Sequence, residues 1–282
     1  MVENRPWADL MTHAVLILGV IVIAFPLYVT FVASTLTYDQ IISVPMPLSP
    51  GGELLENYAQ VLRAGSAKGS HAAVLPMLVN SFVVAVGVAA GKIAISIISA
   101  FAIAYFRFPL RKLFFWMIFV TLMLPIEVRI IPTFKVASDL HLLDSYGGLI
   151  LPLIASATAT FLFRQFYLTI PDELAEAARI DGAGPLRFFW DVLLPLSKTN
   201  IAALFVILFI LGWNQYLWPL LITSQESMYT VVIGIKRMIS GGDSANEWNL
   251  IMATAMLALL PPALVVILMQ KWFVKGLVET EK

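Results

Sequence analysis

The chain has 282 residues, of which 60% are hydrophobic and only 13% are charged, and its mean hydropathy is +0.87. Because a soluble domain is typically about 25% charged, this composition argues against a water-soluble globular protein, and its hydrophobicity excludes a disordered chain. Eighteen basic and eighteen acidic residues give no net charge and there is no cysteine, which excludes an overall electrostatic attraction to nucleic acid, disulfides and thiolate metal sites.

Six stretches of the chain are long and apolar enough to cross a membrane. About 20 helical residues are needed to span a hydrocarbon core of about 30 Å. The sequence therefore predicts an all-α membrane protein with six transmembrane helices. The predicted spans are, in chain order, Met11–Thr35, Met77–Tyr105, Phe114–Thr133, Gly147–Phe166, Ile201–Thr223 and Leu250–Gln270.

The basic residues are unevenly distributed between the predicted loops. Eleven of the eighteen Lys and Arg lie on the face that holds both termini, five lie on the opposite face, and Lys92 and Arg129 fall within spans. Cytoplasmic loops of membrane proteins are enriched in Lys and Arg, so both termini and the loop between the fourth and fifth spans are predicted to be cytoplasmic. The loop of residues 36–76 is then expected on the outer side.

The loop between the fourth and fifth spans has the most distinctive pattern in the sequence. Thr169 is expected to cap a short helix, with Asp172 three residues later as in a capping box. Acidic residues in the first turn suit the positive end of the helix dipole, and Gly182 suits the position after the C-terminus, where φ is positive. A second short helix is expected to begin near Pro185 and to end at Pro195.

The first of these helices has an alanine-rich face. Leu174, Ala177 and Ala178 recur at helical spacing, and the small alanines would let another protein approach closely. The alternative is an amphipathic helix that lies on the bilayer surface, but such helices are usually rich in Lys, Arg and large apolar residues. This helix is acidic and rich in alanine, which favours docking to a protein.

The same loop carries a family pattern. Glu176-Ala177-Ala178, then Gly182 after three residues, then Val192-Leu193-Leu194-Pro195 after nine more, resembles the EAA loop of ABC-importer permeases. Six of the seven fixed positions agree, and the seventh replaces Ile by Val. In that family the loop forms a coupling helix that fits a cleft in the ATPase subunit. The resemblance implies that the ATPase-coupling residues of loop 169–198 are Glu173, Glu176, Ala177, Ala178, Asp181, Gly182 and Pro195.

The resemblance extends over nearly the whole chain. Segments similar to the carbohydrate-importer branch, which includes the maltose G-type permeases, are Arg107–Arg111, Thr121–Pro125, Phe163–Phe166 and Trp213–Pro219. Segments that look most like the E-type permeases of sn-glycerol-3-phosphate (Ugp) importers are Glu3–Trp7 and Phe273–Lys282. This implies a single permease domain over residues 1–282 in the bacterial inner membrane, importing sn-glycerol-3-phosphate or, alternatively, a sugar or another polyol.

The resemblance also implies partners and a division of labour. The expected partners are a second homologous permease subunit, two copies of an ATPase, an extracytoplasmic solute-binding protein and membrane lipid, with no nucleic acid. ATP and Mg²⁺ are expected at the ATPase. No cofactor is expected on this chain, because Gly87, Gly91 and Lys92 lack the spacing and the hydroxyl of a P-loop. Gly87 and Gly91 instead predict close helix packing.

Charged residues inside the predicted spans are candidates for the translocation path. Lys92 and Glu127 both lie roughly 20 Å from the cytoplasmic ends of their spans, at about 1.5 Å per residue. They are expected either to form a buried ion pair that fixes helix packing or to place a positive charge on the path of an anionic solute. Arg129 is expected to snorkel outward or to contact a phosphate.

Polar residues also fall within the fifth predicted span. Asn214 and Gln215 are expected either to hydrogen-bond across helices or to face the solute. Pro219, which has no N–H to donate, is expected to disturb the helix there, and Pro261-Pro262 is expected to kink the sixth span.

Two other classes of protein fit the composition less well. A stand-alone secondary transporter would often show an internal repeat, and it would leave the alanine-rich loop unexplained. An intramembrane enzyme would need a nucleophile with its base or a set of metal ligands. His13, His71 and His141 are too scattered to suggest a metal site.

Overall fold

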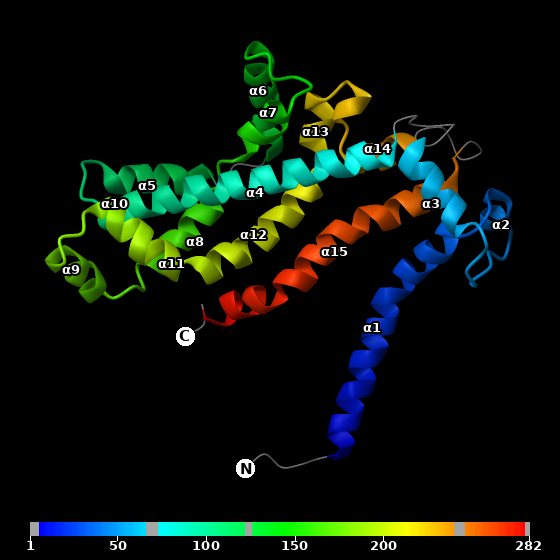
Figure 1. The fold of residues 1–282 in the computed structure, drawn as a ribbon, viewed down its shortest axis with the longest axis horizontal. Coiled ribbons are helices and arrows are strands. Elements are labelled where there is room, and N and C mark those ends of the chain that lie inside the picture. Colours follow the sequence, from blue (N-terminus) through cyan, green and yellow to red (C-terminus); the bar gives the residue numbers. More distant parts are fainter. Residues whose placement is uncertain (1–5, 66–72, 122–125, 240–245, 280–282) are drawn as a thin grey trace. The chain divides into compact units, whose positions relative to one another are not determined.

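The computed structural model describes residues 6–65, 73–121, 126–239 and 246–279 (Figure 1). All the regular structure in these ranges is helical, as the composition predicts. The chain divides into two compact units, which are described separately. The first comprises Met1–Pro76 and Gly234–Leu259, and the second comprises Met77–Ile233 and Leu260–Lys282.

A polar contact fastens the helices of the first unit together. The buried side-chain amide of Asn57 donates to the carbonyl oxygens of Ser34 at 2.9 Å and Leu36 at 3.0 Å, and its oxygen accepts from the amide of Asn249 at 2.9 Å. A buried amide is costly unless it is satisfied, so Asn57 fixes the relative position of three helices. These are α1 (Pro6–Ser34), α3 (Leu54–Arg63) and the start of α15 (Trp248–Glu279). The described part of this unit also contains two short helical elements, α2 (Tyr38–Ile42) and the end of α14 (Val231–Met238).

The second unit is built on α4 (Val74–Tyr105), the longest apolar helix within it. Its α-helices between α4 and α14 are α5 (Arg111–Val120), α6 (Ile126–Asp139), α7 (Tyr146–Ile150), α8 (Ala157–Tyr167), α9 (Asp172–Ile180), α10 (Pro185–Phe188), α11 (Leu194–Leu196), α12 (Lys198–Trp213) and α13 (Leu217–Ile222). The shorter helical turns are η2 (Leu151–Leu153), the π-helical η3 (Phe189–Leu193) and η4 (Glu226–Met228). The buried core shared by α4, α6, α7 and α13 consists of Val84, Val88, Ile130, Ala137, Leu149, Trp218 and Ile222.

Glycines let two helices approach α4 closely. A methyl group on Gly87 would lie 2.6 Å from Cδ1 of Ile150, and one on Gly91 would overlap the side chain of Ile154. The close packing predicted for this glycine pair is therefore confirmed. On another face, Gly212 of α12 leaves room for the backbone of Ala85, whose Cα would lie 3.1 Å from an added methyl group.

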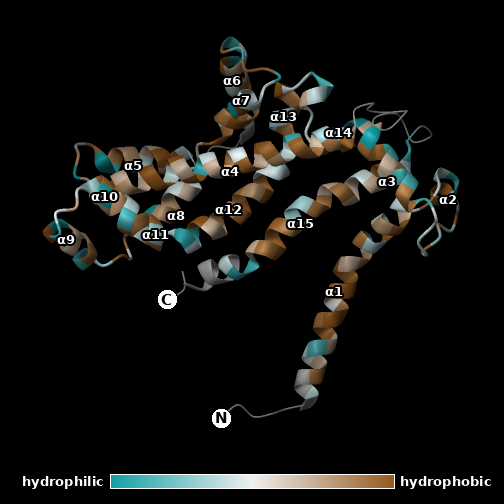
Figure 2. Cartoon of the chain, viewed as in Figure 1, coloured by the Kyte–Doolittle hydropathy of each residue, from teal (hydrophilic) through white to brown (hydrophobic). Residues whose placement is uncertain are grey.

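Three of the described helices are long and apolar enough to cross a membrane by themselves. They match the first, second and sixth predicted spans, at Leu10–Ser34, Val74–Tyr105 and Trp248–Trp272. Hydrophobic residues extend along α1, α4 and α15 in Figure 2. Two bent helix pairs raise the number of candidate spans to five, so three to five apolar spans are present in the described part of the chain.

The remaining predicted spans differ from the observed helices. For the third, Phe114–Thr133, the structure describes α5, which ends at Val120, and α6, which begins at Ile126, while residues 122–125 lie outside the described residues. The fourth, Gly147–Phe166, is a pair of helices bent by 49° between Leu153 and Ala157.

The fifth predicted span, Ile201–Thr223, is also wrong as a single helix. Helix α12 ends at Trp213, and α13 begins at Leu217. The expected disturbance by Pro219 is present, but the break precedes the proline, which lies in the first turn of α13. A proline is tolerated in a first turn, where backbone N–H groups have no partner within the helix, whereas inside a continuous helix it would remove a hydrogen bond.

Candidate functional site

Helix α9 ends in a well-formed capping structure. The N–H of Gly182 donates to the carbonyl of Arg179 at 3.0 Å, and the N–H of Ala183 donates to the carbonyl of Ala178 at 2.8 Å. This pair of bonds is a Schellman motif, and it requires the left-handed conformation that Gly182 adopts, with φ +74°. The predicted role of this glycine as the helix stop is confirmed.

The start of α9 differs from the prediction. Pro171, rather than Thr169, occupies the N-cap position, and no side chain caps the helix. The hydroxyl of Thr169 donates instead to the carbonyl of Phe166 at 2.7 Å, at the end of the preceding helix. Asp172 and Glu173 do lie in the first turn, where their charges suit the helix dipole.

The surface of α9 is open. None of its residues is buried; Ile180 is 86% exposed and Leu174 is 40% exposed. Ala178 is half-buried, and the other residues proposed for coupling on or next to this helix are exposed: Glu173, Glu176, Ala177, Asp181 and Gly182. An amphipathic helix with an uncovered apolar side needs a partner to bury it, so α9 is a candidate docking element.

The chain after α9 forms one helical run from Pro185 to Leu196 and then bends by 69° into α12. Pro185 begins the run, as predicted. The run ends at Leu196, one residue after Pro195, so the predicted end is confirmed to within one residue. The run accommodates this proline after a π-helical turn, in which the N–H of Leu194 donates to the carbonyl of Phe189. Pro195 is exposed, while Ser197 at the bend is fully buried.

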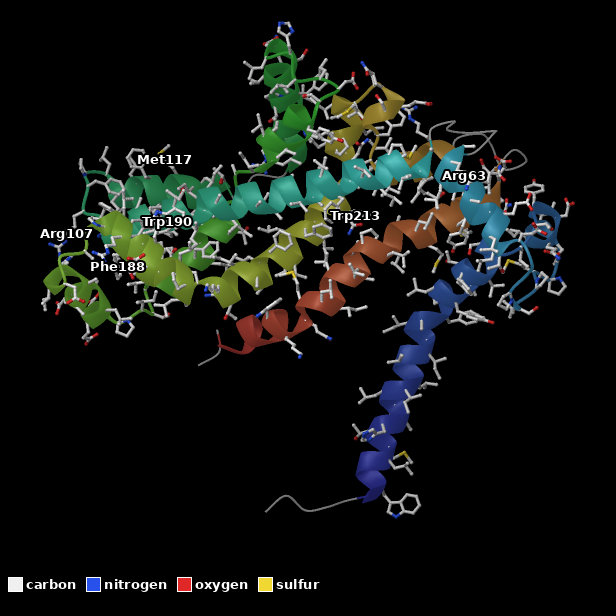
Figure 3. The ribbon with its side chains drawn as sticks, viewed as in Figure 1. Arg63, Arg107, Met117, Phe188, Trp190 and Trp213 are labelled. Carbon is white, nitrogen blue, oxygen red and sulfur yellow. The ribbon has the colours of Figure 1, made fainter. Side chains whose placement is uncertain are left out.

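Two phenylalanines fasten this run to α4. Phe188 is labelled in Figure 3. Its ring centroid lies 5.4 Å from that of Tyr105, and the centroid of Phe189 lies 5.0 Å from that of Phe101. Both phenylalanines are buried, and Tyr105 also contacts Tyr167 of α8 at 6.1 Å. Aromatic pairs at these distances stabilise beyond the area that they bury. These contacts connect the run that follows α9 to α4 and, through Tyr105, to α8.

The candidate path residues are only partly brought together. Lys92 is half-buried on α4, Arg129 is exposed on α6, and their positive charges are close enough to interact. The side chain of Glu127 lies outside the described residues, so its pairing with Lys92 stays a prediction. Asn214 is exposed, and the amide of Gln215, in the break between α12 and α13, donates to the carbonyl of Leu211 in α12 at 3.3 Å.

A polar network near the start of α4 was not predicted. The side-chain amide of Asn80 donates to the carbonyls of Ser227 at 2.8 Å and Tyr229 at 3.0 Å, and its oxygen accepts from the hydroxyl of Tyr146 at 2.7 Å. The hydroxyl of Ser81 accepts from the N–H of Val231 at 2.8 Å. The adjacent polar residues Asn80 and Ser81 inside an apolar span were the signal that could have revealed this network.

Asp144 holds the chain after α13. Its carboxylate accepts hydrogen bonds from the N–H of Ser224 at 2.6 Å, from the N–H of Gln225 at 2.9 Å and from the hydroxyl of Ser224 at 2.6 Å. The bond from Gln225 is the largest cause that lowers the pKa of Asp144 below its ordinary value, followed by the bond from the Ser224 hydroxyl. Together with Asn80, Asp144 fixes the connection between α13 and α14.

Replacing Asp144 by alanine is expected to speed amide exchange at Ser224 and Gln225 by about fivefold, equivalent to the roughly 1 kcal/mol of a typical capping side chain. Because the pKa of Asp144 is lower in the folded state, the stabilisation that its carboxylate provides is present above the unfolded-state pKa of 3.8. This stabilisation is lost as the pH falls through the folded-state pKa. Hydrogen exchange at several pH values measures both effects.

The matched control is Asp139→Asn. Asp139 forms an exposed ion pair with Lys135 at 3.3 Å on α6, which typically contributes little to stability. Unchanged amide exchange at Ser224 and Gln225 in the Asp144→Ala variant would contradict the role of Asp144 in holding this segment.

Comparison with known proteins assigns the chain to a family. The model of the family described as "Binding-protein-dependent transport system inner membrane component" matches residues 92–279. The chain belongs to this family. This inner membrane component is therefore a multi-pass permease of an ABC importer, consistent with its apolar helices.

Close relatives of this permease are similar over their full length. The sn-glycerol-3-phosphate transport system permease proteins UgpE of Brucella melitensis, Rhizobium meliloti and Yersinia pestis are 62%, 61% and 61% identical to it, over 100% of both chains in each case. A crystal structure of a bacterial ABC transporter involved in the import of the acidic polysaccharide alginate matches with a TM-score of 0.80 and 20% identity. The match covers 97% of this permease and 99% of that chain, and it establishes the ABC permease fold.

Proposed function

We propose that this permease carries sn-glycerol-3-phosphate across the inner membrane as part of an ABC importer. The observation that supports this solute is the identity of 61–62% over the whole chain to permeases named for its transport. Because the match covers 100% of both chains, the candidate path and the loop around α9 both lie within it, and the proposal concerns the solute as well as the family.

The proposed arrangement is one permease domain over residues 1–282 with six membrane crossings and both termini in the cytoplasm. The excess of Lys and Arg on the face of the termini supports this orientation. In this arrangement the segment of α12 and α13 crosses the membrane as a broken helix. Broken helices are tolerated where they face other protein segments or a water-filled cavity.

Helix α9 is the proposed coupling helix, held by a cleft of a partner ATPase. Its open surface, its exposed Glu173 and Glu176, and the Schellman motif at Gly182 support this role. ATP and Mg²⁺ bind to the ATPase pair, and a second permease subunit and an extracytoplasmic binding protein complete the complex. When ATP draws the ATPases together, α9 moves with them, and the packing of Phe188 against Tyr105 passes the motion to α4.

The free-energy requirement for this mechanism is simple. ATP must bind more tightly to one of the two access states than to the other, because a ligand shifts an equilibrium only by its differential affinity. Lys92 and Arg129 are the proposed attractive charges for the phosphate of the solute, with Glu127, Asn214 and Gln215 as further path candidates.

Uptake by the assembled complex tests the proposed solute. Proteoliposomes that contain both permeases, the ATPase and the binding protein are expected to accumulate labelled sn-glycerol-3-phosphate in the presence of ATP. Glycerol, maltose and inorganic phosphate are expected to be transported at background rates. Preferential transport of maltose or of an uncharged polyol would assign the permease to another solute of the same branch. Uptake that needs no ATPase would reject the ABC mechanism.

A further inference from the structure

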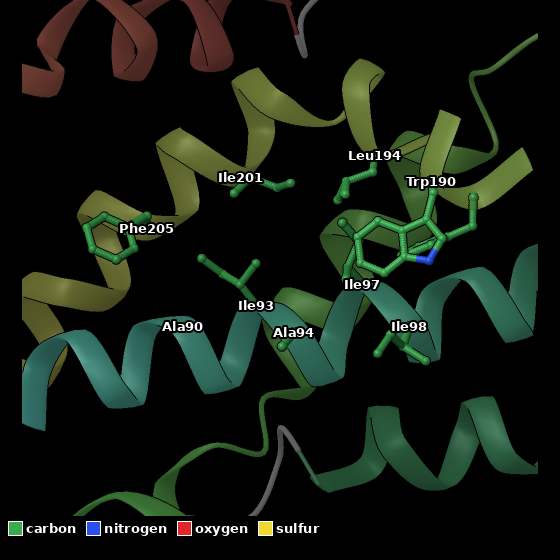
Figure 4. Close-up of a pocket in the computed structure, with 10 residues that line it drawn as sticks. Ala90, Ile93, Ala94, Ile97, Ile98, Trp190, Leu194, Ile201 and Phe205 are labelled. Carbon is green, nitrogen blue, oxygen red and sulfur yellow. The ribbon is translucent and has the colours of Figure 1, made fainter. Parts of the chain in front are cut away.

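An apolar groove of about 400 Å³ lies in the second unit, between α4 and the helical segments that lead into α12 (Figure 4). Ala90 and Ala94 are one turn apart on α4 and leave space because they carry only a methyl group. Ile97, Trp190 and Ile201 are among the larger side chains around that space. Almost all of the lining surface is apolar, so the groove has no polar group to bind a hydrophilic solute.

The groove lies at the depth of lipid acyl chains. Ala94 precedes Tyr105, the last residue of α4, by eleven residues, which corresponds to about 16 Å at 1.5 Å per residue. With the proposed orientation, in which the end of α4 is cytoplasmic, this depth lies near the middle of a hydrocarbon core about 30 Å thick, where the acyl chain of a lipid in the cytoplasmic leaflet ends.

Two basic residues adjoin the groove. Lys198 precedes Ile201 by three residues on α12, and Arg187 precedes Trp190 by three residues on the preceding helical run. Residues three apart lie on the same side of a helix, so each cation is one turn away from a side chain that lines the groove. Both cations are exposed, and Arg187 also forms an exposed pair with Asp191 at 3.2 Å.

We propose that the groove binds an acyl chain of an anionic phospholipid from the cytoplasmic leaflet, with the lipid phosphate held by Lys198 and Arg187. The volume of about 400 Å³ is large enough for an apolar chain of several methylene groups. Basic pockets between transmembrane helices on the cytoplasmic side bind anionic lipid headgroups. Trp190, which is 61% exposed at the groove, suits the membrane interface.

The charges favour a lipid over an apolar helix of the partner permease. A helix seated in the groove would bury apolar area equally well, but it would offer no anion to Lys198. A phospholipid would fill the groove with its acyl chain and place its phosphate beside Lys198. Because Asp191 offsets part of the charge of Arg187, Lys198 contributes the larger share of phosphate binding.

Photo-crosslinking of the assembled complex tests this site. The complex is placed in phosphatidylcholine vesicles that contain a trace of phosphatidylglycerol with a photoreactive acyl chain, and labelled peptides are identified by mass spectrometry. Labelling is expected at Ala94, Ile97 and Ile201, and unlabelled phosphatidylglycerol is expected to compete better than phosphatidylcholine. Lys198→Gln is expected to weaken phosphatidylglycerol binding about fivefold, taking about 1 kcal/mol for this cation, and the Arg187→Gln/Lys198→Gln pair more than fivefold but less than the roughly thirtyfold that two equal cations would give.

The matched control is the Arg107→Gln/Lys112→Gln pair, which removes two exposed cations before and at the start of α5. It is expected to leave groove labelling unchanged. Ala94→Phe, which fills the groove, is expected to abolish labelling there, while the amount of assembled complex verifies folding. Equal competition by the two lipids would overturn the proposal. So would labelling of the isolated chain that disappears in the complex, because the partner permease would then occupy the groove. Labelling is measured without transport, so its failure leaves the proposed solute untouched.

Discussion

Replacing Gly182 by valine is expected to abolish coupled uptake while the complex remains assembled. Gly182 has φ +74°, a conformation that costs a residue with a side chain roughly 1–2 kcal/mol and a β-branched residue more. A methyl group at this position would contact nothing within 4 Å, so the cost is conformational rather than steric. The strain would be relieved by opening the Schellman motif, which would loosen the end of the proposed coupling helix.

Gly182→Asn is the matched variant. Asparagine enters the left-handed region more readily than valine does, so it is expected to retain most of the uptake. Binding-protein-stimulated ATPase activity and labelled uptake measure the coupling, and copurification of the ATPase measures assembly. Normal coupled uptake in the valine variant would show that Gly182 and the end of α9 take no part in coupling.

The coupling loop was largely predictable because its signals are local. A glycine that ends a helix and a proline that begins the next one act through backbone conformation at their own positions, and Gly182 and Pro185 do so here. Thr169 was misassigned because Pro171 determines where the helix begins. The end predicted at Pro195 agrees to within one residue with the observed end at Leu196.

The contacts between helices that are distant in the chain could not be predicted from one sequence. Phe188 packs on Tyr105 and Asp144 accepts from Ser224, pairs separated by about eighty residues. Apolar periodicity identifies a buried face, but it does not identify which distant helix covers that face. Hydropathy likewise identified three uninterrupted spans, whereas the bend between Leu153 and Ala157 leaves the average hydropathy unchanged.

Gly148→Ala is expected to reduce the amount of folded permease sharply. Gly148 is buried in α7, and a methyl group there would overlap the backbone carbonyl of Leu142. Its own carbonyl accepts a hydrogen bond from the indole of Trp218 at 3.0 Å, so the backbone cannot shift without weakening a buried contact. Overpacking of this kind typically lowers the free energy of unfolding by about 1–3 kcal/mol. The loss is at the upper end of this range where backbone, rather than a flexible side chain, must move.

The adjacent glycine provides the control for this prediction. A methyl group on Gly147 would meet its nearest neighbour, the side chain of Leu142, at 3.4 Å, which is an ordinary contact. Alanine also forms helices better than glycine by up to about 1 kcal/mol, so Gly147→Ala is expected to be neutral or stabilising. The apparent melting temperature of the detergent-solubilised complex distinguishes the two variants. Equal melting temperatures would show that α7 can move away from Leu142, and that the close approach of these segments does not determine stability.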